Sequence, residues 1–218
     1  MYLLTSAYLA PIHYYTKLYS GHPVVEERCE HYVKQTYRNR CLIATTHGVQ
    51  ALTIPVEGRP LEEGGTSKTP TRDIRLSEHG RWRELHWNAL RTAYENTPFF
   101  DYYADDFERI YRGHQHFLVD FNEEMQQTVL SLLSLEIDWR SNTERYVEQQ
   151  EGNPDFIDLR ERIRPKIPFD FDPEFTPKPY YQVFASKLGF LPNLSIIDLL
   201  FNMGPESRLV LRDSYRKH

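Results

Sequence analysis

The sequence predicts an α/β fold, with a mixed α+β arrangement as the alternative. An N-terminal βαβ unit and a β-hairpin are expected to precede several helices and a Pro-rich wrapping segment. Three observations support this prediction: two strand-like runs separated by a short helical run, two further β-rich runs around a Gly turn, and apolar residues at helical spacing in the middle of the chain. A length of 218 residues suits a single domain covering residues 1–218.

The βαβ unit is expected within the first 28 residues. Residues 2–9 (YLLTSAYL) predict a buried strand, and Pro11 suits the start of a helix that Gly21 ends. Residues 23–28 (PVVEER) predict a second strand. Because the connection is about a dozen residues long and contains a helix, the two strands are expected to pair in parallel.

A hairpin and a loop are expected next. Residues 39–46 and 50–56 are rich in β-forming residues and flank His47-Gly48-Val49. Residues 57–72 contain several Gly and Pro residues and no periodicity, which predicts a long loop, either disordered or functional.

The second half of the chain is expected to be mainly helical. Residues 73–76 predict a short strand, and a helix is expected from Ser77 to about Tyr94. Further helices are expected at residues 101–112 and from Asp120, which begins a capping-box pattern. The apolar face of the first helix comprises Trp82, Leu85, His86, Ala89, Leu90 and Ala93.

The C-terminal third is expected to hold less regular structure. Residues 136–164 are polar and predict loops with a helical piece, and the prolines of residues 165–179 predict an extended segment that wraps the surface. Ser195 begins a second capping box for a short apolar helix, which Gly204-Pro205 ends and which is expected to be the last ordered element.

Composition excludes several classes of function. The net charge is −5 and the charges are well mixed, so no basic stripe suits nucleic acid. No apolar run approaches the roughly 18 residues of a membrane span, and the N-terminus does not resemble a signal peptide. Cys29 and Cys41 are therefore expected to be reduced thiols in a cytoplasmic protein.

Familiar catalytic motifs are absent from the sequence. It contains no GxGxxG, no GxxxxGK[ST], no GxSxG and no HExxH. His114 and His116 would share a face on a strand, but they lack a third ligand, so a solvated loop is expected and no metal is assigned. The cofactor and the oligomeric state are left open.

The connection after the first strand is one candidate site. It places His13 and Lys17 in the first turns of a helix that follows a parallel strand, where anionic ligands often bind. The alternative is that Tyr8, Pro11 and Tyr14 pack in the core.

The segment HYVKQTYRNR is a second candidate. Lys34, Arg38 and Arg40 have the same parity and would share one face of a strand. Three cations on one face could hold a phosphate or carboxylate, or could form a solvated edge.

The block at residues 86–103 is the third candidate. His86 lies on the apolar face of its helix, as a hydrogen-bonded core residue or as a neutral general base. Trp87, Tyr94 and the aromatic residues after Pro98 either line a pocket for a sugar or planar ring, or pack between two helices.

Several blocks together resemble a known family. The runs YLAPIHYYTKL, YRNRCLIATTHGVQALTIPVEG, DIRLSEHGRWRELHWNALRTAYENTPFFDYYADDF, LVDFNEEM and PNLSIIDLLFNMGPES resemble the WbqC-like family in its Bacteroidetes-type form. Members occur near genes for cell-surface polysaccharides, which implies transfer of an acyl or amino-acyl group to a sugar. The resemblance implies an acidic position at Glu26 or Glu27. It also marks Tyr8, Pro11, Asn39, Arg40, His86, Tyr94, Pro98 and Phe100 as typical family positions.

Two hypotheses about function follow. The first is an enzyme acting on a nucleotide-sugar or related small anionic substrate, and the second is a non-catalytic binding or assembly partner of a glycan-synthesis enzyme. In the first, His86 or His13 is the acid/base. The substrate-binding candidates are Tyr8, Lys34, Arg38, Asn39, Arg40, Trp87 and Tyr94.

Overall fold

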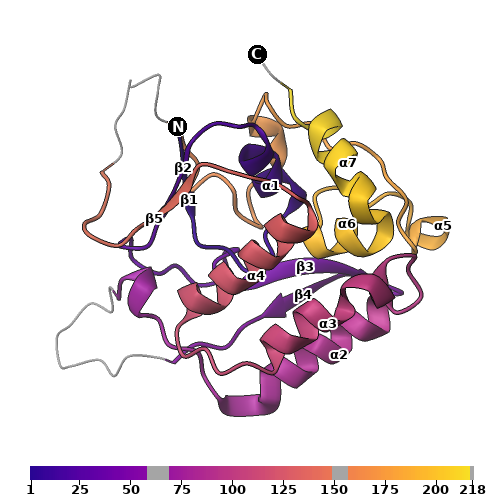
Figure 1. Cartoon of the computed structure of the whole chain (residues 1–218), viewed down its shortest axis with the longest axis horizontal. Coiled ribbons are helices and arrows are strands. Elements are labelled where there is room, and N and C mark those ends of the chain that lie inside the picture. The colour runs from indigo at the N-terminus through magenta and orange to yellow at the C-terminus, as the bar shows by residue number, and fades with distance from the viewer. Residues whose placement is uncertain (58–68, 149–156, 217–218) are drawn as a thin grey trace.

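A parallel sheet contains the N-terminal βαβ unit together with two strands from later in the chain (Figure 1). The computed structural model describes residues 1–57, 69–148 and 157–216, and within them four strands pair in the order β5–β2–β1–β6. β1 (Tyr2–Thr5) lies between β2 (Val24–Glu27) and β6 (Ile157–Asp158), and β5 (Trp139–Asn142) borders β2. All three pairings are parallel, and α1 (Ile12–Tyr19) connects β1 to β2. The predicted βαβ unit is therefore confirmed.

The hairpin is also confirmed. β3 (Arg40–Thr45) and β4 (Gly48–Thr53) pair antiparallel, with Thr45 opposite Gly48. In Figure 1 the hairpin runs above α2 (Trp82–Tyr94) and α3 (Phe100–Tyr111), which lie side by side. α6 (Ile196–Met203) also contacts β3, so the hairpin forms one wall of the helical part of the core.

The predicted loops of residues 136–164 contain two strands of the sheet instead. β5 has the sequence WRSN and β6 only Ile157-Asp158. Neither run is apolar or long enough to predict a strand by itself. They form because β2 and β1 offer free backbone edges, on which β5 pairs with Val24–Glu27 and β6 with Tyr2 and Leu3.

The start of the central helices differs from the prediction. Residues 73–76 form no strand ladder: a 3-10 helix (Thr71–Asp73) is followed by isolated bridges at Arg75 and Leu76. A 3-10 turn (His79–Arg81) precedes α2, which begins at Trp82 and not at Ser77, because the backbone of Gly80 has φ +79°. The buried face of α2 also shifts, leaving Leu85 62% exposed while Trp87 and Tyr94 are buried.

The two expected helix caps have different outcomes. α4 (Leu118–Leu132) begins before Asp120, which lies in its first turn and makes no capping bond there. At α6, Ser195 Oγ accepts a hydrogen bond from the amide of Ile197, so this cap is confirmed.

The chain continues as a helix beyond the expected end. α6 stops before Gly204, whose φ is +53° and whose added Cβ would lie 2.4 Å from the ring of Phe99. A 3-10 turn (Gly204–Glu206) and α7 (Ser207–Ser214) follow, so the prediction that the apolar helix is the last ordered element was wrong. A Gly-Pro pair ends one helix but does not prevent another from beginning, because Pro fits a first helical turn. No helix in the described residues has the length and apolar character needed to cross a bilayer.

The Pro-rich segment is expected to lie on the surface, but part of it is buried in the fold. It holds a 3-10 turn (Phe169–Phe171) and precedes the short α5 (Ala185–Leu188). Asp172 and Phe175 are buried. The Asp172 carboxylate is paired in the interior, since His13 Nε2 and Lys17 Nζ each lie 2.6 Å from it. Burial alone would raise the pKa of Asp172, but hydrogen bonds from His13 and Lys17 lower it to about 2.

Asp172 is expected to stabilise the fold in a pH-dependent way. Its folded-state pKa lies below the unfolded value, so the stabilisation is complete above roughly pH 4 and is lost as the pH falls toward 2. Asp172→Asn should lower the free energy of unfolding at pH 7 by about 3 kcal/mol, because buried Lys17 loses a carboxylate partner. Denaturant unfolding at several pH values measures the difference, which should shrink below pH 4. Asp170→Asn, at an exposed position of the same segment, is the matched control and should change little.

Candidate functional site

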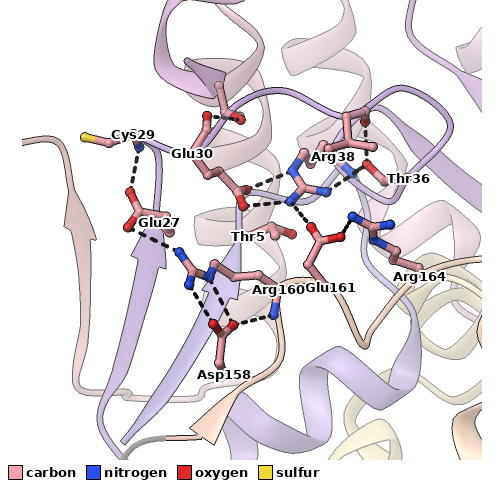
Figure 2. Close-up of polar contacts among 12 residues, drawn as sticks. Thr5, Glu27, Cys29, Glu30, Thr36, Arg38, Asp158, Arg160, Glu161 and Arg164 are labelled. Atoms are coloured by element: carbon pink, nitrogen blue, oxygen red, sulfur yellow. Dashed lines mark hydrogen bonds and ion pairs between the residues drawn. The ribbon is translucent and has the colours of Figure 1, made fainter. Parts of the chain in front are cut away.

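Charged side chains gather where the parallel strands end (Figure 2). Because the strands are parallel, their carboxyl ends meet at one edge of the sheet, and open α/β sheets bind ligands in the crevice beyond that edge. Cys29 and Glu30 follow β2, while Arg160 and Glu161 follow β6. We call this group the carboxyl-edge site.

Arg38 organises one half of the carboxyl-edge site. Its Nε and Nη2 donate to the two carboxylate oxygens of Glu30, both at 2.8 Å, and Nη2 also lies 3.3 Å from Glu161. Nη1 donates to Thr36 Oγ1 at 3.1 Å. Burial raises the pKa of Glu30, which the Arg38 guanidinium opposes. The bidentate geometry fixes both side chains, and Arg164 extends the chain of ion pairs through Glu161.

Arg160 organises the other half. Its Nε and Nη2 bind the two oxygens of Asp158, at 3.0 and 2.6 Å, and Nη1 donates to the carbonyl of Val147 at 2.9 Å. The guanidinium carbon lies 4.7 Å from the ring centre of Tyr146 and Nη1 lies 3.7 Å from Glu27. Figure 2 shows the resulting chain of charges from Glu27 through Arg160 to Asp158.

Glu27 holds the surrounding loops in place. Its side chain is fully buried and accepts hydrogen bonds from the amides of Cys29 and Val147 and from Asn142 Nδ2. These partners come from the turn after β2, from β5 and from the segment that follows β5. One carboxylate therefore fastens three segments around the carboxyl-edge site.

The carboxyl-edge site encloses a pocket of about 490 Å³. Buried Glu30 and Arg160 contribute to its wall, and the exposed side chains of His31, Tyr146 and Glu161 lie where it meets solvent. The remaining lining residues are Cys29, Val33 and Asp158. A pocket of this size can accommodate a small sugar or a nucleoside.

Cys29 lines the pocket and is a free thiol. Its Sγ accepts a hydrogen bond from Arg72 Nη1 at 3.3 Å and lies 3.9 Å from the carbonyl of Asn142. Burial raises the pKa of the thiol, and the nearby Arg72 guanidinium opposes this without reversing it. Cys29 is therefore protonated at neutral pH and is a weak nucleophile in this state.

The predicted residues Tyr8 and His86 meet, but in the core and not in the carboxyl-edge site. Tyr8 Oη lies 3.0 Å from His86 Nδ1 and also hydrogen-bonds the hydroxyl of Tyr111. Tyr8 is 0% and His86 7% exposed. Burial lowers the pKa of His86 to about 4, which a hydrogen bond to the backbone of Thr53 opposes, so the ring is neutral. The two side chains form a buried hydrogen-bond network.

His13 lies in a different place from both His86 and the pocket. It belongs to α1 and donates from Nε2 to the ionised Asp172, while its ring stacks on Phe175 at 4.4 Å between centres. Burial lowers the pKa of His13, and the Asp172 carboxylate opposes this. The contacts that the structure describes for His13 fasten the Pro-rich segment to α1.

The cationic segment is not a strand, so the expectation that Lys34, Arg38 and Arg40 share one strand face was wrong. Residues 34–39 form turns, with Gln35 at φ +60°, and β3 begins only at Arg40. Lys34 is exposed and Arg40 Nε donates to Thr53 Oγ1 at 3.0 Å. Alternating parity requires extended backbone, which these turns interrupt.

Trp87 and Tyr94, the substrate-binding candidates from the block at residues 86–103, pack in the core. Trp87 stacks on Phe100 at 5.9 Å, and Tyr94 donates to Asp198 at 2.8 Å while accepting from the amide of Ala44. Asn39 Nδ2 donates to the carbonyl of Ile54 at 2.9 Å. Of the predicted site residues, the structure thus brings Arg38 into the carboxyl-edge site. The substrate-binding and catalytic roles of all of them stay predictions.

His114 and His116 lie in a loop, as the sequence predicts. His114 and His116 belong to the connection between α3 and α4. Within the described residues, no group of three or more His, Cys, Asp or Glu side chains is placed to hold a metal ion.

Most of the carboxyl-edge site was missed from the sequence. Glu27 was noted only as an acidic position after the second strand, and Asp158, Arg160 and Glu161 fell within residues taken for loops. The available signal was the charged run DLRER at residues 158–162 directly after Ile157. It resembles any solvated surface run until β6 is known to lie in the parallel sheet.

The comparisons with known proteins cover most of the chain. A model of the WbqC-like protein family matches residues 6–166. The chain belongs to the WbqC-like family. The chain is 28% identical over 205 residues to the uncharacterized protein Rv1507c of Mycobacterium tuberculosis. This match covers 83% of this chain and 84% of that protein. No solved structure matches the chain significantly. The matched family region includes both chains of ion pairs in the carboxyl-edge site, from Glu27 to Arg164.

His86 is expected to make stability depend on pH. Its folded-state pKa lies below the unfolded value, so the stabilisation is complete above roughly pH 6.5 and is lost as the pH falls toward 4. His86 should contribute a loss of about 3 kcal/mol in denaturant unfolding of the unsubstituted protein, and this contribution should be absent in His86→Gln, which retains that of His13. His47→Gln, at the exposed hairpin turn, should retain the His86 contribution. An NMR titration midpoint of the His86 ring near 6.5 would contradict this expectation.

Arg38 is expected to be needed for folding. Arg38→Lys should lower the free energy of unfolding by about 3 kcal/mol, because an ammonium group cannot keep the two-point contact with buried Glu30. Arg40→Lys is the matched control, with an expected loss of about 0.5 kcal/mol or less. Urea unfolding measures both variants. Equal stability of Arg38→Lys and the unsubstituted protein would show that the contact with Glu30 is not structural.

Proposed function

We propose that the protein is a cytoplasmic enzyme of cell-surface polysaccharide synthesis that binds a sugar-containing substrate in the pocket of the carboxyl-edge site. It transfers an acyl or amino-acyl group to that sugar. The observation that carries the proposal is the pocket itself, which lies beyond the carboxyl ends of the parallel strands and is lined by charged groups that ion pairs hold in place.

The lining suits a sugar in its chemistry. The carboxylates of Glu30, Asp158 and Glu161 are acceptors for hydroxyl groups, and the Tyr146 ring offers an aromatic surface. The positions of Glu30 and Asp158 are fixed before a ligand arrives, because Arg38 and Arg160 bind them in two-point contacts. Such preorganisation lowers the entropic cost of binding and orients the reacting group.

The polysaccharide setting comes from the family. The chain belongs to the WbqC-like family. The family resemblance seen in the sequence implies a setting of cell-surface polysaccharide synthesis. Transfer of a small acyl or amino-acyl group onto a sugar is a reaction that such synthesis requires. This supports the choice of a sugar over other small polar ligands of similar size.

The alternative is a non-catalytic binding or assembly partner of a glycan-synthesis enzyme. One observation favours it: Tyr8, a predicted substrate-binding residue, and His86, a predicted acid/base, are buried in the core. The same pocket would then bind a sugar without changing it.

A ligand screen with a pocket-filling variant tests the proposal. Nucleotides, nucleotide-sugars, free sugars, acyl-CoA compounds and amino acids are compared by thermal shift, and a sugar-containing ligand should raise the Tm. Val33→Trp fills the pocket and should abolish the shift, whereas Val49→Trp, on the exposed side of the hairpin, should preserve it. Equal shifts in both variants would contradict binding at this pocket.

Turnover separates the enzyme from the alternative. The sugar that binds is incubated with acyl and amino-acyl donors, and mass spectrometry follows the sugar. Gain of the acyl mass, lost in Val33→Trp and kept in Val49→Trp, supports the enzyme. Binding without any change of mass supports the non-catalytic partner.

A further inference from the structure

Arg38 and Arg160 of the carboxyl-edge site already donate to acceptors. Arg38 donates to Glu30, Glu161 and Thr36, using all three of its nitrogens. Arg160 donates through Nε and Nη2 to Asp158 and through Nη1 to the carbonyl of Val147. A bound phosphate would compete with these acceptors for either guanidinium. The sequence-based expectation that Arg38 holds an anionic substrate therefore requires the substrate to compete with Glu30 and Glu161.

The carboxylates, in contrast, keep acceptor capacity. An ionised carboxylate offers about four acceptor positions. Among the donors that the structure describes, Glu30 receives two, both from Arg38, and Asp158 receives three, all from Arg160. Glu161 contacts one guanidinium through each oxygen and has a 60% exposed side chain. These three carboxylates therefore have unused lone pairs that can accept hydrogen bonds from a ligand.

The charged groups that line the pocket are mainly carboxylates. Among the described residues, its lining contains the carboxylates of Glu30, Asp158 and Glu161 and the guanidinium of Arg160. Arg38 and Arg164, which are not among these lining residues, balance the charges of Glu30 and Glu161 through ion pairs, so the preference for a cation rests on the unused acceptors of the three carboxylates. An ammonium group supplies three donors and a positive charge, and its hydrogen bonds to carboxylates are stronger than those of neutral hydroxyls.

Resting on the proposed function, we infer that the sugar bound in this pocket carries a protonated amino group, which Glu161 contacts together with Glu30 or Asp158. The substrate class is an amino sugar. A sugar phosphate is not held by its phosphate in this pocket. An amino sugar also presents hydroxyl groups, which the remaining lone pairs of the same carboxylates accept.

An NMR titration of the full chain with matched sugars tests this inference. Glucosamine, galactosamine and mannosamine are each compared with the parent hexose, the N-acetyl derivative and the hexose 6-phosphate. At least one amine should bind about tenfold more tightly than its parent, and N-acetylation should remove the gain, because it removes the charge and two of the donors.

A conservative variant locates the amine. Glu161→Gln keeps the size of an exposed side chain and removes its charge, so it should weaken binding of the amino sugar about fivefold and leave the parent hexose within about twofold. Glu95→Gln, at an exposed position at the end of α2, is the matched control and should change neither affinity.

The outcomes separate the two proposals. If a parent hexose or a sugar phosphate binds as tightly as the amine, and Val33→Trp abolishes that binding, the inference about the amino group is wrong while the pocket stands. Unchanged affinity for the amino sugar in Glu161→Gln also overturns the inference. If Val33→Trp leaves all sugar binding intact, or no sugar binds, the proposed function fails with it.

Discussion

The pairing of buried charges is the constraint on which the arrangement of this protein depends. Moving a carboxylate or guanidinium out of water costs several kcal/mol unless an opposite charge and hydrogen bonds compensate. Arg38 meets this requirement with Glu30, Arg160 with Asp158, and Lys17 with Asp172. The contacts of Arg38 with Glu161, of Arg160 with Glu27 and of Lys17 with Asp172 join segments that are distant in the sequence, and the first two bring together the segments after β2 and β6.

The same constraint shapes the chemistry of the carboxyl-edge site. Because the arginines are bound to carboxylates, they serve as supports and the carboxylates present their remaining acceptors to the pocket. The core contains a second kind of polar group, hydrogen-bonded but neutral, in which burial keeps His86 uncharged beside Tyr8. The two environments thus hold paired charges at the carboxyl edge and neutral hydrogen-bonded groups in the core.

Local patterns predicted the elements that depend on local forces. The Val-rich run of β2, the Gly turn of the hairpin and the cap at Ser195 act within a few residues, and all three are present. β5 and β6 could not be predicted, because WRSN and Ile157-Asp158 become strands only through the free edges of β2 and β1. The start of α2 was misplaced for a smaller reason, the left-handed backbone of Gly80 within an otherwise helical pattern.

The sequence by itself determined the α/β class, the parallel βαβ unit, the hairpin and most of the helices, since apolar periodicity and turn residues specify these through neighbouring contacts. It also determined the family, because its blocks resemble the WbqC-like pattern that residues 6–166 match. Only the tertiary structure decided which polar residues meet. Glu27, Glu30, Asp158 and Arg160 come from segments more than 120 residues apart, and sheet pairing and ion pairing between distant segments leave no short-range pattern in the sequence.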